Sequence, residues 1–205
     1  MDTENKRNKH TCTIFFIILF QYFLLYKTGR TIAQEEGIMP FIHKLADIEL
    51  KQNNSPASDF LWKSSLPLEE ISKSKYLHFD IKSLFPDKFS YPYHFHRNAE
   101  ELFVILEGEA TLRSPKGYQT VSKGDMIFFE EGLEGAHQFY NHGDQPFLYI
   151  DLRTKANVDV CEYPDSGKIN ILPAMDIFTK DAKVPYYTGE EGVREKWPEE
   201  ILKKK

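Results

Sequence analysis

The chain has 205 residues, a length that fits one globular domain with tails, and its formal net charge is −5. It carries no large basic block, so we expect no nucleic-acid partner. Its 2 cysteines are too few for a disulfide framework, and without a CxxC spacing they argue against thiolate zinc or redox chemistry.

Residues 1–33 form a hydrophobic leader. Basic residues near the start precede an apolar run over residues 14–26, about 13 residues long, whereas a membrane span needs roughly 20. This pattern is typical of a secretory signal peptide. The alternative is a misassigned start, with translation beginning at Met39. We expect a cytoplasmic protein in the second case. In the first case we expect export or membrane anchoring, with membrane contact only through residues 14–26.

The pattern of apolar and turn residues divides the chain after the leader into three expected parts. These are an N-terminal extension (34–74), a barrel (75–155) and an extended C-terminal tail that packs on the barrel (156–205). Within the barrel, short apolar and aromatic runs alternate with Gly, Pro, Asn and Asp turn residues. The expected strands are Tyr76–Ile81, Tyr91–His96, Leu102–Leu106, Glu109–Arg113, Tyr118–Val121, Asp125–Phe129, Ala136–Asn141 and Phe147–Leu152. Many short strands at this spacing predict an all-β sandwich or barrel, closed as in a jelly-roll.

Three histidines are candidate metal ligands. His94 and His96 are separated by one residue in an expected strand. Side chains alternate along a strand, so both imidazoles point the same way and can reach one ion. His137 shares a face with Phe139 in a later strand, and closure of a barrel can bring it beside the first pair.

Glu101 is the candidate fourth ligand. It shares a face with Phe103 and Ile105, so it would point into the barrel interior. A carboxylate there needs a charged partner, because burying it unpaired costs several kcal/mol. Glu100 is the alternative ligand if a bulge reverses the facing. Three imidazoles and one carboxylate suit a single divalent Fe, Mn, Ni, Co or Zn ion and do not choose among them.

The motif around these residues resembles that of the cupin superfamily. Tyr93-His94-Phe95-His96 is followed by Glu101 after four residues, and by Gly108 after six more, as in the first cupin motif. Residues 124–141, which include His137, resemble the second motif. Two departures lie in one loop: Glu130 stands where proline is usual, and the stretch 132–137 is longer than the common pattern. The runs 100–103, 134–137 and 163–168 also resemble an uncharacterised bacterial subgroup of cupins.

The resemblance implies a double-stranded β-helix and a transition-metal site at His94, His96, Glu101 and His137, and it makes a homodimer plausible. It implies no particular reaction, because a fold does not fix a function. Two functions stay open. One is a metal-dependent enzyme that oxygenates, isomerises or decarboxylates a small polar molecule. The other is a non-catalytic module that binds or senses a small ligand or sugar. No general base outside the ligand set stands out, and Arg153 is only a weak pocket candidate.

Overall fold

The computed structural model describes residues 40–53 and 55–203. The chain divides into two units, Met1–Ile48 and Glu49–Lys205. The described part of the first unit holds one short 3-10 turn, η2 (Leu45–Asp47). The expected leader lies outside the described residues. No helix among the described residues combines the length and the apolarity needed to cross a bilayer.

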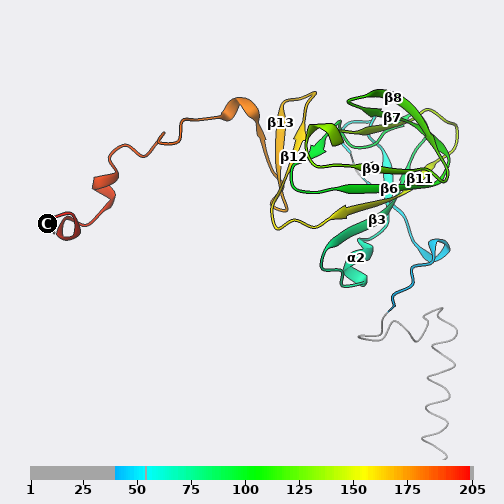
Figure 1. Cartoon of the computed structure of the whole chain (residues 1–205), viewed down its shortest axis with the longest axis horizontal. Coiled ribbons are helices and arrows are strands. Elements are labelled where there is room, and N and C mark those ends of the chain that lie inside the picture. Colours follow the sequence, from blue (N-terminus) through cyan, green and yellow to red (C-terminus); the bar gives the residue numbers. More distant parts are fainter. Residues whose placement is uncertain (1–39, 54, 204–205) are drawn as a thin grey trace, which may run out of the picture. The chain divides into compact units, whose positions relative to one another are not determined.

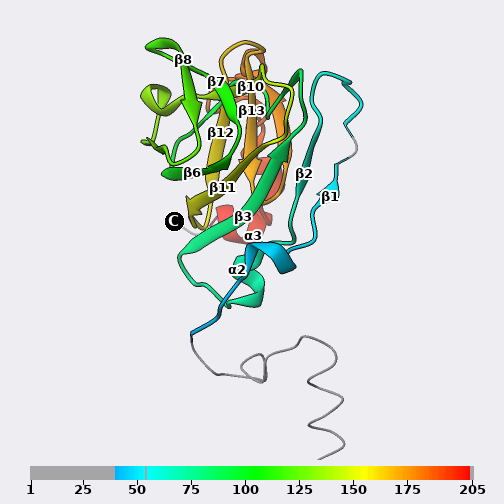
Figure 2. The same cartoon turned by 90° about the vertical axis from the view of Figure 1, so that its right-hand side faces the viewer.

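The largest sheet of the second unit is antiparallel throughout (Figure 1). In spatial order, its strands in the described residues are β1 (Lys51–Gln52), β2 (Trp62–Ser64), β3 (Leu77–Leu84), β11 (Phe147–Thr154), β6 (Glu101–Glu107) and β9 (Met126–Phe129). The long strands β3 and β11 run side by side over their whole length (Figure 2).

Two further sheets complete this unit. The second sheet contains β4 (Lys88–Phe89), β10 (Gln138–Asn141), β7 (Glu109–Ser114) and β8 (Gly117–Ser122). The third sheet contains β14 (Asp176–Thr179), β13 (Lys168–Leu172), β12 (Asp159–Tyr163) and β5 (Phe95–His96). The helical elements are short: α2 (Leu68–Ile71), η3 (Leu133–Gly135), η4 (Lys180–Ala182), η5 (Val193–Lys196) and α3 (Glu199–Leu202).

The predicted all-β fold is confirmed, and the expected strands have counterparts, but the expected strand Tyr91–His96 is reduced to β5 at Phe95–His96, with His94 in an isolated bridge before it. The segment after residue 156 differs from the extended tail that the sequence predicts, because it forms the strands β12 and β13 and then the exposed strand β14. Its prolines do not interrupt a strand: Pro164 lies in the turn after β12 and Pro173 follows β13. At these positions a missing N–H removes no ladder hydrogen bond. β12 pairs with β5 and so supports one of the candidate ligands, His96.

The hydrophobic core lies between the first two sheets. It follows from the alternation of side chains along each strand, which turns one face of each sheet inward. The buried cluster contains Leu84, Phe103, Ile105, Ala110, Leu112, Val121, Phe129, Phe139, Phe147 and Tyr149. At the edge of the core, two turns approach each other closely at Gly108. This residue has a φ of +80°, and an added Cβ would lie only 2.7 Å from the Pro146 carbonyl oxygen.

The inner face of the large sheet changes from polar to apolar along the strands. Residues opposite each other in antiparallel strands share a face, so the register defines rows of neighbours. In order, these rows are His78–Arg153–Glu101, Asp80–Asp151–Phe103, Lys82–Tyr149–Ile105 and Leu84–Phe147. The charged groups therefore gather at one end of the barrel interior and the hydrophobic side chains at the other.

Candidate metal centre

Three separate backbone connections bring the predicted ligands together. His94 and His137 form an isolated antiparallel bridge, in which the His137 N–H donates to the His94 carbonyl at 2.9 Å. His96 lies in β5, which pairs with β12, and Glu101 is the first residue of β6. The site is therefore positioned by sheet hydrogen bonds on each side rather than by a flexible loop.

The unusual loop before His137 is a tight turn. Residues 133–135 form η3, and a Cβ added to Gly135 would lie only 1.9 Å from the Glu130 carbonyl oxygen. Only glycine fits such an approach without moving the backbone. The Gly135 carbonyl in turn accepts a hydrogen bond from Nδ1 of His137 at 2.9 Å. The longer loop therefore fixes the orientation of the histidine that follows it.

The four predicted ligands are buried and lie next to one another. The ring centroids of His94 and His137 are 4.7 Å apart, and those of His94 and His96 are 5.3 Å apart. The Glu101 carboxylate lies between the rings of His96 and His137, at 3.4 Å from Nε2 of each. Exposure ranges from 3% for His137 to 8% for His94. The structure thus assembles residues that the sequence separates by more than 40 positions.

Each histidine uses Nδ1 for a hydrogen bond to a neighbouring oxygen. Nδ1 of His94 donates to the Pro92 carbonyl at 2.8 Å, and Nδ1 of His137 donates to Gly135. Nδ1 of His96 is hydrogen-bonded to the carboxylate of Asp159. A carbonyl oxygen can only accept, so Nδ1 carries the hydrogen and Nε2 of a neutral ring keeps its lone pair. Such outer partners orient histidines that bind metals through the other nitrogen.

This arrangement fits a cation better than it fits a hydrogen-bond network. Lone pairs on Nε2 of two histidines face carboxylate oxygens across 3.4 Å, longer than a normal N–H···O bond. Burial lowers the pKa of His137 to about 4 and also lowers the pKa of His94, so both rings are neutral near pH 7. Burial raises the pKa of Glu101 to about 7, although Arg153 opposes this shift. The group therefore lacks a positive charge at its centre.

Two alternative ligands are less suitable. Glu100 is exposed, and its backbone N–H donates to the Thr154 hydroxyl at 3.0 Å, so its side chain lies outside the cluster. Cys161 is buried, and its sulfur lies within 4.8 Å of the ligand atoms of His94 and His96. Burial raises the pKa of the Cys161 thiol to about 12, so without a bound cation it is the neutral thiol.

A cavity of about 260 Å³ adjoins the cluster. Besides the predicted ligands, its wall contains Lys82, Tyr91, Asp151, Arg153, Tyr163 and Asn170. Arg153 lies close to the cluster, with Nη1 3.5 Å from Nε2 of His96. Burial, followed by the charge of Glu101, raises the pKa of Asp151 to about 7. The buried Oδ1 of Asn170 has no hydrogen-bond partner among the described residues.

Sequence reasoning missed most of this wall, including Lys82, Asp151 and Asn170. Lys82 is buried beside Asp80, with Nζ and Oδ2 2.6 Å apart. Burial alone would lower the pKa of Lys82, but Tyr91, Asp151 and Asp80 outweigh it and raise that pKa. The alternation of His78, Asp80 and Lys82 along one strand was the available signal. It shows that the three side chains share a face but not that this face is the interior.

Comparison with known proteins identifies the domain. The family described as Cupin domain matches residues 83–153. No curated protein matches the sequence. A sugar phosphate isomerase of the cupin superfamily from Silicibacter pomeroyi superposes with a TM-score of 0.61 and 21% identity, covering 71% of this chain and 96% of that one. A protein from Acidithiobacillus ferrooxidans, provisionally assigned as a sugar phosphate isomerase, gives 0.60 and 18%, covering 68% and 90%.

At these identities the two solved structures establish the fold alone. The family match covers His94, His96, Glu101 and His137. Together with the antiparallel barrel described above, this match identifies residues 83–153 as a cupin domain.

Proposed function

We propose that His94, His96, Glu101 and His137 bind one divalent transition-metal ion, and that the adjoining cavity binds a small polar molecule beside it. The observation that carries this proposal is the set of hydrogen bonds at Nδ1. They occupy Nδ1 of each histidine and leave Nε2 of His96 and of His137 turned towards the Glu101 oxygens at 3.4 Å. A divalent cation would attract both the ring nitrogens and the Glu101 carboxylate.

The donor set suits Fe, Mn, Ni, Co or Zn in the divalent state. Four protein ligands leave further coordination positions on a six-coordinate ion, and a bound ion would supply Lewis-acid or redox chemistry there. The chain's own side chains supply the rest. Arg153 offers a positive charge beside the cluster, and the orphaned Oδ1 of Asn170 can accept a hydrogen bond from a ligand hydroxyl or amine.

Asp151 makes an enzyme the favoured form of this function. Its carboxyl group lines the cavity, and burial holds its pKa at about 7, where it can both accept and donate a proton near neutral pH. Proton transfer between neighbouring carbons of a sugar is chemistry that such a group can perform. Because two structures with this fold are named as sugar phosphate isomerases, sugar phosphates are the first substrates to test.

Metal analysis is the first test. Elemental analysis of protein purified without added metal should give close to one transition-metal ion per chain, and the His94→Ala variant should lose it. Asp165→Asn is a matched control, because Asp165 pairs with Arg113 on the surface and lies outside the cluster. Wild-type protein that takes up no divalent transition metal when titrated, or a His94→Ala variant that retains it fully, would contradict the proposal.

Turnover is the second test. Metal-loaded protein should interconvert an aldose phosphate and a ketose phosphate. The reaction is measured by the exchange of the substrate C–H proton with deuterated water. Asp151→Asn should lose most of this exchange and keep its metal, whereas His94→Ala should lose both. Tight ligand binding without exchange in the wild type would favour a non-catalytic binding module instead. Unchanged exchange in Asp151→Asn would remove the proposed role of that carboxyl group.

A further inference from the structure

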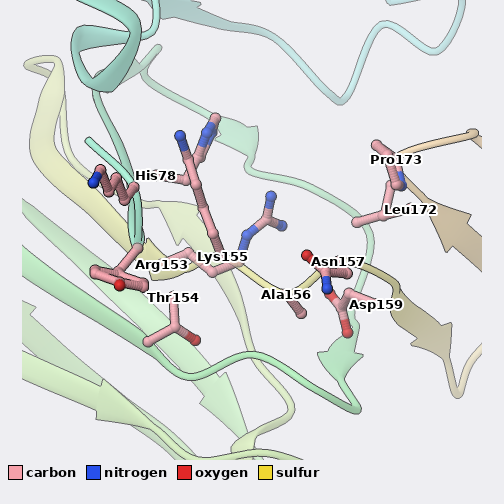
Figure 3. A pocket seen from close by; sticks show the side chains of 11 residues that line it. His78, Arg153, Thr154, Lys155, Ala156, Asn157, Asp159, Leu172 and Pro173 are labelled. Carbon is pink, nitrogen blue, oxygen red and sulfur yellow. The ribbon is translucent and has the colours of Figure 1, made fainter. Parts of the chain in front are cut away.

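A second cavity lies next to the one that contains the candidate ligands. Its volume is about 480 Å³, and its wall includes Lys75, His78, Arg153, Lys155, Asp159 and Leu172 (Figure 3). His78, Arg153 and Leu172 also line the inner cavity of about 260 Å³, so the two spaces adjoin across these side chains. We call the outer space the vestibule.

The vestibule holds more positive charge than it can neutralise. Lys75 and Lys155 form no ion pair with any carboxylate in the described part of the chain, and Arg153 points its charge at the boundary with the inner cavity. Lys155 is held in place, since its Nζ donates to the Ser74 carbonyl at 3.1 Å and its backbone N–H donates to Tyr76 at 2.7 Å. Lys155 is therefore a positioned charge at the wall of the vestibule.

The acidic groups nearby are already occupied. Asp159 uses one oxygen for Nδ1 of His96 and the other for the backbone N–H of Asn98 at 3.0 Å. Glu69 pairs with Nδ1 of His78 at 2.5 Å and accepts the Phe79 N–H at 3.3 Å. Neither carboxylate is available to neutralise the lysines. A concave space with unbalanced positive charge raises the local concentration of small anions.

We propose that the vestibule binds the anionic end, a phosphate or a carboxylate, of a molecule whose other end reaches the His94–Glu101 cluster. This inference rests on the proposed function and names its substrate class as small polar molecules with one terminal oxyanion. Lys75 and Lys155 hold the oxyanion from the outer wall. Arg153 lies at the boundary and contacts both the anionic end and the region of the candidate metal.

The test uses inorganic phosphate and acetate, titrated separately into the full-length, metal-free protein by calorimetry at low ionic strength. We expect at least one of the two to bind, and the Lys75→Gln/Lys155→Gln double variant to weaken that binding by about ten-fold or more. The ion that binds more tightly shows whether the site prefers phosphate or carboxylate. Lys116→Gln/Lys123→Gln is the matched control, because both lysines are exposed and lie outside the vestibule, and it should change the affinity less than two-fold.

Absence of binding by both ions at millimolar concentration would overturn the inference, as would equal affinity in the wild type and the vestibule variant. Failure of the proposed function gives a different result. If phosphate binding depends on the lysines but the wild type takes up no metal, the vestibule stands as an anion site and the metal centre does not. If the wild type binds metal but neither ion, the vestibule alone is wrong.

Discussion

The two ends of this barrel interior are built from the same strands but have opposite requirements. At the apolar end, Leu84, Phe139 and Phe147 are fully buried and need only close packing. At the polar end, Arg153 lies on the same strand as Phe147 and opposite Glu101 on β6, and buried charges there cost free energy unless they are partnered. The comparison shows that the apolar end stabilises the fold. The polar end has buried charges that would not gather without the fold around them.

Removing a large side chain from the apolar end should have the largest effect on stability. Phe139 is completely buried among Phe103, Phe147 and Tyr149. Phe139→Ala should lower the free energy of unfolding by about 3–5 kcal/mol, measured by denaturant titration, with or without metal. Tyr118→Ala is the control, because Tyr118 is 75% exposed and its loss should cost about 0.5 kcal/mol or less. A loss below about 1 kcal/mol for Phe139→Ala would show that this end does not carry the stability.

A backbone change beside the polar end should affect stability and metal binding together. Gly135→Ala forces the turn before His137 apart, because its Cβ would lie 1.9 Å from the Glu130 carbonyl oxygen. We expect a loss of about 1–3 kcal/mol in unfolding free energy and a weaker metal affinity. Gly124→Ala is the matched control: its φ of +96° also strains alanine, but no atom lies within 4 Å of the added Cβ. Equal metal affinity in both variants would mean that the turn does not position His137.

A change to an outer partner should affect metal binding with little effect on stability. Burial alone would raise the pKa of Asp159, but its hydrogen bonds to His96 and to the Asn98 backbone lower it, so this carboxylate is ionised. Asp159→Asn keeps the shape and removes the charge. We expect metal affinity to fall about 10–100-fold, measured by competition with a chromophoric chelator. The same affinity as the wild type would show that Asp159 does not support the site.

The smallest expected effect is a pH-dependent proton release on metal binding. The pKa of Glu101 is raised to about 7, so in the metal-free protein this group is mostly protonated at pH 6 and mostly ionised at pH 8. His94 and His137, whose pKa values are lowered by burial, are already neutral and release no proton. Calorimetry in buffers of different ionisation enthalpy should show release of about one proton per metal ion at pH 6, decreasing towards pH 8.

Asp151→Asn is the control for this measurement, because the nearby Asp151 carboxyl, also with a pKa of about 7, can contribute protons of its own. The release at pH 6 should persist in this variant if Glu101 is its source. A release that does not change between pH 6 and pH 8 would contradict the assigned protonation state of Glu101.

Local sequence patterns predict the strands and the convergence of His94, His96, Glu101 and His137, because alternation and turn residues act over a few positions. They do not predict the wall of the cavity. Lys82 faces Tyr149, and Asp151 faces Phe103, only because β11 pairs with β3 and β6 in one particular register. Register depends on pairing between distant segments, which a single strand does not encode.

The strands after residue 156 were missed for a different reason. Pro164 and Pro173 interrupt the pattern of the segment, and the sequence therefore favours an extended tail. In the structure both prolines lie outside the ladders, and β12 gains its stability from pairing with β5 and β13. The same pairing places Asp159 and Cys161 beside His96, so the missed strand also supplies the missed partners of the candidate site.

The most direct test of the metal centre is X-ray absorption spectroscopy of the zinc-loaded protein. We predict a first shell of nitrogen and oxygen at about 2.0–2.2 Å, with outer scattering from imidazole rings and no sulfur. Cys161→Ser should leave this spectrum unchanged, and His94→Ala should retain no bound zinc. A sulfur shell at about 2.3 Å that disappears in Cys161→Ser, or a first shell without imidazole scattering, would contradict the assignment of His94, His96, Glu101 and His137 as the ligands.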